Sequence, residues 1–143
     1  MKYILIALLL TIAATSFSQQ TKITITARDQ SLHLYLDSNN ANSLFIIHNA
    51  SFSGNDYLTI KVDGDSAYKN WKRNFSIYDT ANAAIKDFVL MKDETYCLKL
   101  NDLKKLLALE QSYFIYTTAI PKDPQQAMLV RVAKQLVCKI KIL

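Results

Sequence analysis

The chain has 143 residues, of which 50% are hydrophobic and 20% charged, and its formal net charge at pH 7 is +5. This apolar content argues against a disordered chain and is enough to form the core of one domain. The basic residues are scattered along the sequence instead of grouped, which predicts a solvated surface with a general attraction to anionic partners.

The N-terminal segment, residues 1–18, has the pattern of a secretory signal peptide. Lys2 precedes an apolar run over residues 4–14, and Ser16-Phe17-Ser18 supplies the small residues of a cleavage site. We therefore expect a secreted or periplasmic protein, with residues 19–143 as a single domain without a transmembrane segment. Outside the cytoplasm, a protein, another cell-envelope component or a glycan is the expected partner, and nucleic acid is not.

Alternating apolar and polar residues, rich in β-branched and aromatic types, predict strands through the first two-thirds of the chain. These stretches are residues 22–28, 32–36, 44–48, 57–62, 71–78, 88–91 and 95–100. Asp63-Gly64-Asp65 and Lys92-Asp93-Glu94 are turn signals between neighbouring strands. The small and polar residues 79–86 predict a connection with room for one helical turn.

Residues 101–110 change to helical spacing, with Leu103, Leu106 and Leu107 on one face. One short helix is therefore expected within a chain of strands. Tyr113 follows this corner and resembles the tyrosine corner of immunoglobulin-like domains, which implies that fold for the chain.

Residues 113–120 are mostly apolar on both faces, which is typical of a central strand. Pro121 ends this strand, because proline donates no hydrogen bond to a ladder. Asp123-Pro124 predicts the N-cap and first position of a single helical turn. Between Met128 and Ile142, apolar residues alternate with polar ones, which predicts a long, half-buried return strand with a bulge near residues 133–135.

Together these elements give about eight short strands at spacings near ten residues, with neither a βαβ rhythm nor an internal repeat. The expected fold class is all-β: an antiparallel β-sandwich, immunoglobulin-like in topology, with one short helix before the C-terminal hairpin. A closed eight-stranded β-barrel is the alternative.

Sequence motifs of catalysis are missing. The two glycines are isolated, so no glycine-rich loop can cradle a phosphate, and neither a GxSxG nor a Cys-x-x-Cys pattern occurs. The two histidines, His33 and His48, have no local nucleophile or metal-ligand pattern. We predict that the chain is not an enzyme and holds no cofactor or metal; a hydrolase would need one of these histidines within hydrogen-bond reach of a nucleophile.

The two cysteines, Cys97 and Cys138, form an even pair in a chain that is expected in an oxidising compartment. Strand parity places Cys97 on the polar face with Lys99 and Cys138 on the core face. A disulfide between them requires a bulge that turns one of the side chains. A bridge and two free thiols both remain open.

Aromatic and basic side chains are interleaved in the middle of the chain, a composition typical of recognition surfaces. The candidate binding residues are Tyr68, Lys69, Trp71, Lys72, Arg73 and Tyr78, with Lys122 and Asp123 from the proline-bracketed loop. The alternative for Trp71 is the core tryptophan of a sandwich. We therefore expect a non-catalytic binding or structural module, with a small-ligand or carbohydrate-binding protein as the alternative.

Overall fold

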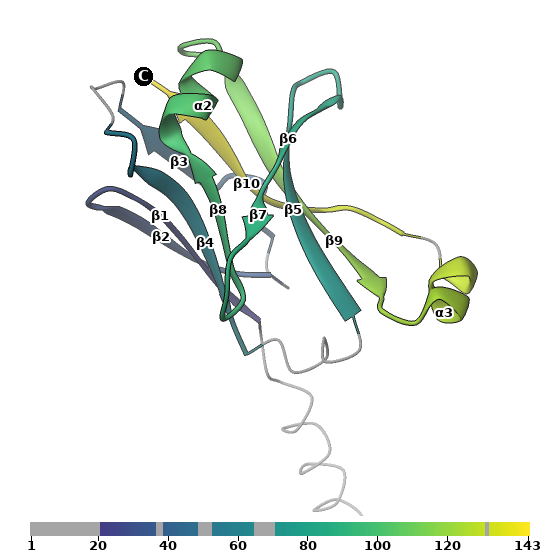
Figure 1. Ribbon diagram of the computed structural model, residues 1–143. Helices are drawn as coiled ribbons and strands as arrows, with labels where there is room; N and C mark the ends of the chain where they lie inside the picture. Colours follow the sequence, from purple (N-terminus) through teal and green to yellow (C-terminus); the bar gives the residue numbers. More distant parts are fainter. Residues whose placement is uncertain (1–20, 37–38, 49–52, 65–70, 131) are drawn as a thin grey trace, which may run out of the picture.

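Two five-stranded β-sheets pack face to face in the computed structural model (Figure 1). It describes residues 21–36, 39–48, 53–64, 71–130 and 132–143, so the predicted signal peptide lies outside the described residues. The strands are β1 (Lys22–Ala27), β2 (Gln30–Tyr35), β3 (Leu44–Ile47), β4 (Tyr57–Asp63), β5 (Trp71–Tyr78), β6 (Ala84–Asp87), β7 (Val89–Leu90), β8 (Thr95–Lys99), β9 (Ser112–Pro121) and β10 (Gln135–Ile142). The helices are α2 (Leu100–Leu106) and α3 (Pro124–Leu129).

The hydrophobic core lies between the sheets, because the side chains of each strand alternate between the two faces. In β4 the buried residues Leu58, Ile60 and Val62 alternate with more exposed ones. In the facing sheet, Phe75 and Ile77 of β5 are fully buried. One cluster of buried apolar side chains contains residues from both sheets, so the two layers share a single core.

The strand order is that of an immunoglobulin-like sandwich, as predicted. The first sheet has the order β2-β1-β4-β8-β7 and the second β3-β10-β9-β5-β6. The series β1-β4-β8-β7 corresponds to the A-B-E-D sheet of that fold, and β10-β9-β5 corresponds to its G-F-C sheet. Tyr113 at the start of β9 makes the corner bond, since its hydroxyl accepts from the Ala108 amide at 2.8 Å.

The barrel alternative is wrong. Among the described strands, β2 and β7 are the edges of the first sheet and β3 and β6 the edges of the second, so neither sheet closes on itself. The sandwich is also not purely antiparallel, because β3 runs parallel to β10, with Phe45 opposite Ile140. A parallel pair needs a long connection, and most of the chain lies between these two strands.

The return strand is shorter than predicted. It begins at Gln135 instead of Met128, because the helical turn continues to Leu129 as α3. The predicted cap is present, and the Gln125 amide donates to the Asp123 carboxylate at 3.0 Å. Residues 118–121 of β9 pair with β5 on one side only, because the segment before Gln135 does not run alongside them.

Strand β6 was missed by the sequence analysis, which expected a connection over residues 79–86. It is an edge strand with little buried surface, and it pairs with β5 through Ser76 and Asp87. Burial is what produces a regular apolar alternation, so an exposed edge strand of this kind leaves no periodic signal.

The disulfide alternative is wrong, because Cys97 and Cys138 are free thiols. Cys97 lies on β8 in the first sheet, where it alternates with the buried Tyr96 and Leu98, and Cys138 lies inward on β10 in the second. The bulge in β10 falls between Leu136 and Cys138, whereas Cys97 lies on the other sheet and keeps the outward parity predicted from the sequence.

Candidate functional site

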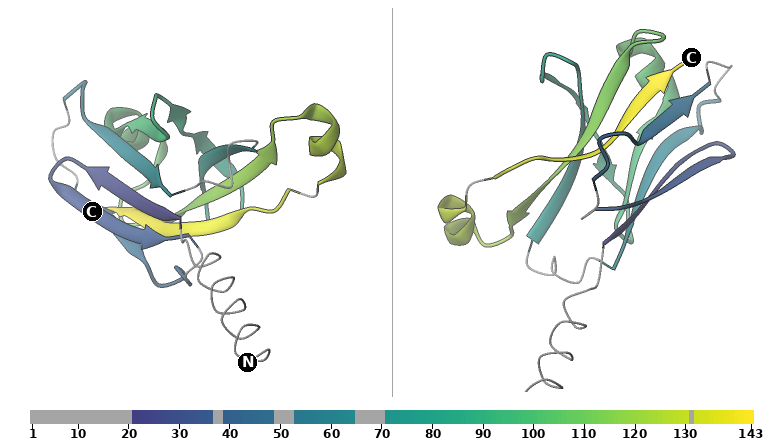
Figure 2. Two further views of the ribbon diagram at one scale, coloured as in Figure 1. Left: turned by 90° about the horizontal axis from the view of Figure 1, so that it is seen from below. Right: turned by 180° about the vertical axis from the view of Figure 1, so that it is seen from behind.

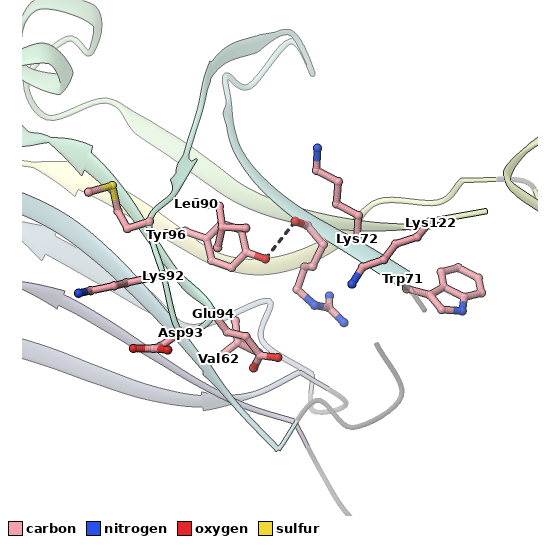
Figure 3. A pocket seen from close by; sticks show the side chains of 11 residues that line it. Val62, Trp71, Lys72, Leu90, Lys92, Asp93, Glu94, Tyr96 and Lys122 are labelled. Atoms are coloured by element: carbon pink, nitrogen blue, oxygen red, sulfur yellow. Dashed lines mark hydrogen bonds between the residues drawn. The ribbon is translucent and has the colours of Figure 1, made fainter. Parts of the chain in front are cut away.

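A cleft opens between the two sheets where β5 begins (Figure 3). The second sheet contributes the start of β5, Lys122 directly follows β9, and the first sheet contributes the end of β4 and the hairpin of β7 and β8. Its volume is about 200 Å³. The lining residues are Val62, Trp71, Lys72, Arg73, Leu90, Met91, Lys92, Asp93, Glu94, Tyr96 and Lys122.

The floor of the cleft is formed by Tyr96, which connects the two sheets. Its side chain is 6% exposed, and its hydroxyl donates to the carbonyl oxygen of Arg73 at 3.0 Å (dashed in Figure 3). The ring packs edge-on against Phe75 with centroids 4.8 Å apart. This polar bond and ring contact hold the inner end of the cleft in one shape.

Arg73 is buried rather than part of an exposed surface. Its side chain is 5% exposed, and Nη1 donates to the Thr117 hydroxyl at 3.1 Å. That hydroxyl in turn donates to the carbonyl oxygen of Asn74 at 2.9 Å. The inward position follows from strand parity: Arg73 and Phe75 are two residues apart on β5, so their side chains point to the same face of the sheet. Its guanidinium supplies positive charge to the wall of the cleft from inside the sandwich.

The two sheets bring opposite charges to the cleft. Arg73 comes from β5 and Lys122 directly follows β9, whereas Asp93 and Glu94 come from the turn between β7 and β8 in the first sheet; the Lys72 side chain points away, on the exposed face of β5 (Figure 3). A site with both signs of charge and an aromatic floor suits a polypeptide, which presents mixed side chains, better than a purely anionic ligand.

The turn that carries the two carboxylates has a strained backbone. Asp93 and Glu94 both have φ of 55°, in the left-handed region. Two successive residues of this kind make the type I′ hairpin turn, for which Asn-Gly is the favoured pair. Neither residue here is glycine, so the turn retains two carboxylates at a conformational cost of roughly 1–2 kcal/mol per residue.

The rim of the cleft is apolar and open to solvent. Leu90 is 50% exposed and Met91 is 62% exposed. Leu90 lies opposite Tyr96 in the β7–β8 pairing, so it is on the face of the sheet that looks into the cleft.

The structure brings together only part of the predicted binding surface. Trp71, which is half-buried, Lys72 and Lys122 line the cleft with Arg73. Tyr78 is at the other end of β5, and its ring packs edge-on against that of Tyr116 at 5.2 Å.

The other predicted residues do not line this cleft. Asp123 caps α3. Tyr68 and Lys69 lie outside the described residues. Trp71 is half-buried and lies outside the core, so it is not the core tryptophan of the alternative interpretation, whereas Phe75 on β5 is fully buried.

Sequence analysis missed the half of the cleft that the first sheet provides. Leu90, Met91, Glu94 and Tyr96 were assigned to an ordinary hairpin. Two signals were present: a short strand whose apolar residues continue into Met91, and a tight turn without glycine. Neither one indicates that the hairpin faces the start of β5, which depends on the packing of the two sheets.

Apart from one exposed histidine–threonine pair, groups with nucleophilic or metal-binding chemistry are dispersed over the described part of the chain. His33 is exposed, and its Nδ1 lies 3.1 Å from the Thr24 hydroxyl across the β1–β2 pair. The Cys97 sulfur has Thr59 as its neighbour, at 3.8 Å. Burial raises the pKa of the Cys138 thiol to about 12, so this thiol stays protonated at neutral pH. Among the described residues, no group of three His, Cys, Asp or Glu side chains could hold a metal ion.

No protein-family model, curated protein or solved structure shows significant similarity to the chain. Over the residues that the structure describes, none of the helices has the length and apolar character to cross a bilayer.

Proposed function

We propose that the chain is a secreted or periplasmic, non-catalytic binding module that takes up an extended segment of another polypeptide at strand β7. The observation that carries the proposal is the cleft beside β7, which is lined by Trp71, Tyr96 and the exposed Leu90 and Met91. The compartment follows from the signal-peptide pattern of residues 1–18.

The size of the cleft favours a side chain over a whole small molecule. Its volume is about 200 Å³, whereas pockets for drug-sized ligands are about 300–1,000 Å³. One large side chain of a partner fits such a space, and the rest of the partner must then lie outside it. An extended segment along β7 meets both conditions.

The edge of the first sheet is suited to this role. β7 is an edge strand with exposed apolar side chains, since Val89 and Leu90 are 58% and 50% exposed. Proteins usually protect a sheet edge with charge, as β6 does here with the exposed Lys86 and Asp87. β7 carries no charge but has only two residues, so an added strand forms few backbone hydrogen bonds with it, and the cleft selects the side chain of that strand.

The alternative of a carbohydrate-binding protein requires a flat row of exposed rings. The aromatic side chains on the outer face of the second sheet are Tyr78, Phe114 and Tyr116. Their planes differ by 81° between Tyr78 and Tyr116 and by 43° between Phe114 and Tyr116. Because sugar rings stack on parallel faces, these tilted rings support polypeptide binding at β7 more than sugar binding on this face.

A pair of matched variants tests the proposal. Leu90→Lys places a charge at the cleft, and Leu109→Lys places the same charge at a residue of similar exposure, 53%, after α2. We expect immobilised wild type and Leu109→Lys to retain the same protein from the envelope fraction, and Leu90→Lys to retain at least about tenfold less of it. Equal retention by both variants, or no protein retained specifically by the wild type, would contradict the proposal.

A further inference from the structure

The hairpin between β9 and β10 carries the most exposed apolar side chains in the described part of the chain. We call residues 122–134 the arm. Met128 and Leu129 of α3 are 87% and 86% exposed, and α3 buries none of its residues. Figures 1 and 2 show the arm projecting away from both sheets. Two apolar side chains at the tip of a projection need an environment that covers them.

The base of the arm is fixed to the sandwich. The Lys134 ammonium lies 4.0 Å from the centroid of the Tyr78 ring and 4.4 Å from that of Tyr116, and it also donates to the Asn82 side-chain oxygen. Cation–π contacts of this kind stabilise an ammonium between two rings. The capping of α3 by Asp123 adds order within the arm. The exposed pair is therefore presented by a structured hairpin.

The charge of the arm is complementary to an anionic surface. Among the described residues of the arm, Lys122 and Lys134 outnumber the single acidic residue, Asp123. At the base of the arm, the exposed Lys72 on β5 pairs with Ile120. Basic residues that flank an apolar tip match a lipid bilayer, in which hydrocarbon lies behind a layer of negative headgroups.

The shape of the arm also favours a bilayer over a protein. A stable protein interface covers about 800 Å² on each partner. The tip offers two large side chains on a six-residue helix, and it is convex, so it would need a deep groove in any protein. A bilayer surface is soft and continuous, and it accepts small insertions at any point.

We propose that the arm docks the domain on an anionic lipid bilayer, with Met128 and Leu129 entering the boundary between headgroups and acyl chains. The inserted residues Met128 and Leu129 are not part of the cleft at β7, although Lys72 and Lys122 border both sites. Two inserted side chains and a few cations give weak and reversible attachment, as for a peripheral protein. The membrane would then hold the cleft close to segments of other envelope proteins.

Sedimentation with lipid vesicles tests this proposal on the purified mature protein. One set of vesicles contains phosphatidylglycerol and phosphatidylcholine, and the other contains phosphatidylcholine alone. We expect at least about tenfold stronger binding to the anionic set, and weaker binding as salt is raised. The double variant Met128→Ser/Leu129→Ser should lose at least about tenfold in binding to the anionic vesicles.

Leu109→Ser is the matched control, because Leu109 is 53% exposed and lies before β9, whereas the arm follows it. This variant should bind anionic vesicles as the wild type does. Unchanged thermal unfolding of the double variant shows that its fold is intact, as expected for side chains that contact almost nothing. Binding by the double variant equal to that of the wild type would overturn the proposal. The proposal would also be overturned if the wild type did not prefer anionic vesicles. That result is expected if the arm binds a protein instead of a bilayer.

Discussion

Replacing Tyr96 by phenylalanine removes one hydrogen bond between the two sheets and leaves the ring in place. The Tyr96 hydroxyl donates to the Arg73 carbonyl oxygen at 3.0 Å inside the sandwich, and the ring contacts Phe75. The ring contact survives in the variant, so the loss is that of a buried hydrogen bond. A typical bond of this kind contributes about 1 kcal/mol, and an acceptor left without a partner raises the cost to about 1–3 kcal/mol.

Urea unfolding followed by circular dichroism measures this loss. We expect Tyr96→Phe to lower the free energy of unfolding by about 1–2 kcal/mol with an unchanged dependence on urea. Tyr116→Phe is the matched control, because Tyr116 is half-buried on the outer face of the second sheet and keeps its ring contacts. Its effect should stay within about 0.5 kcal/mol. Equal stability of Tyr96→Phe and the wild type would refute the hydrogen bond as a link between the sheets.

Three further predictions concern the turn and the cysteines. Glu94→Gly should raise the free energy of unfolding by about 0.5–1 kcal/mol, because glycine adopts a positive φ without steric strain, and the greater backbone entropy of the unfolded chain offsets only part of this gain. A loss of stability in urea unfolding would contradict a left-handed Glu94. The pKa of Cys138 is raised from 9.0 to about 12 on folding, so the unfolded chain loses this proton first and stability should fall as pH rises from 9 towards 12; in Cys138→Ala that fall should be smaller, and equal slopes would rule out the buried thiol as a cause. A thiol reagent should label Cys97 in the native protein and Cys138 only after unfolding; fewer than two free thiols in the denatured chain would contradict the structure.

The elements with one buried face could be predicted from the sequence. The strand Trp71–Tyr78 was placed at its observed bounds, and residues 113–120 were correctly assigned to a central strand. These segments have regular apolar alternation or two apolar faces, which burial in a sheet requires. The Tyr113 corner was also visible, because the bond that it makes is local.

Two other features had no readable local signal. Met128 has the parity of the predicted core face, yet Met128 and Leu129 both lie in α3 and are exposed, because the chain forms a helix there and pairs with β9 only from Gln135 onward. The cleft is lined by the start of β5 and by the β7–β8 hairpin, and this pairing of elements joins two sheets. No pattern within one strand encodes that pairing, so the aromatic and basic half of the cleft was predicted and the other half was not.

Site-specific photo-crosslinking tests the binding site at β7 most directly. A photoreactive phenylalanine analogue at position 90 lies beside the cleft, and the same residue at position 109 lies after α2 and outside the cleft. Irradiation of the protein in its native envelope should give a discrete, protease-sensitive adduct from position 90 and none from position 109. The same adducts from both positions, or no protein adduct from position 90, would contradict a polypeptide-binding cleft at β7.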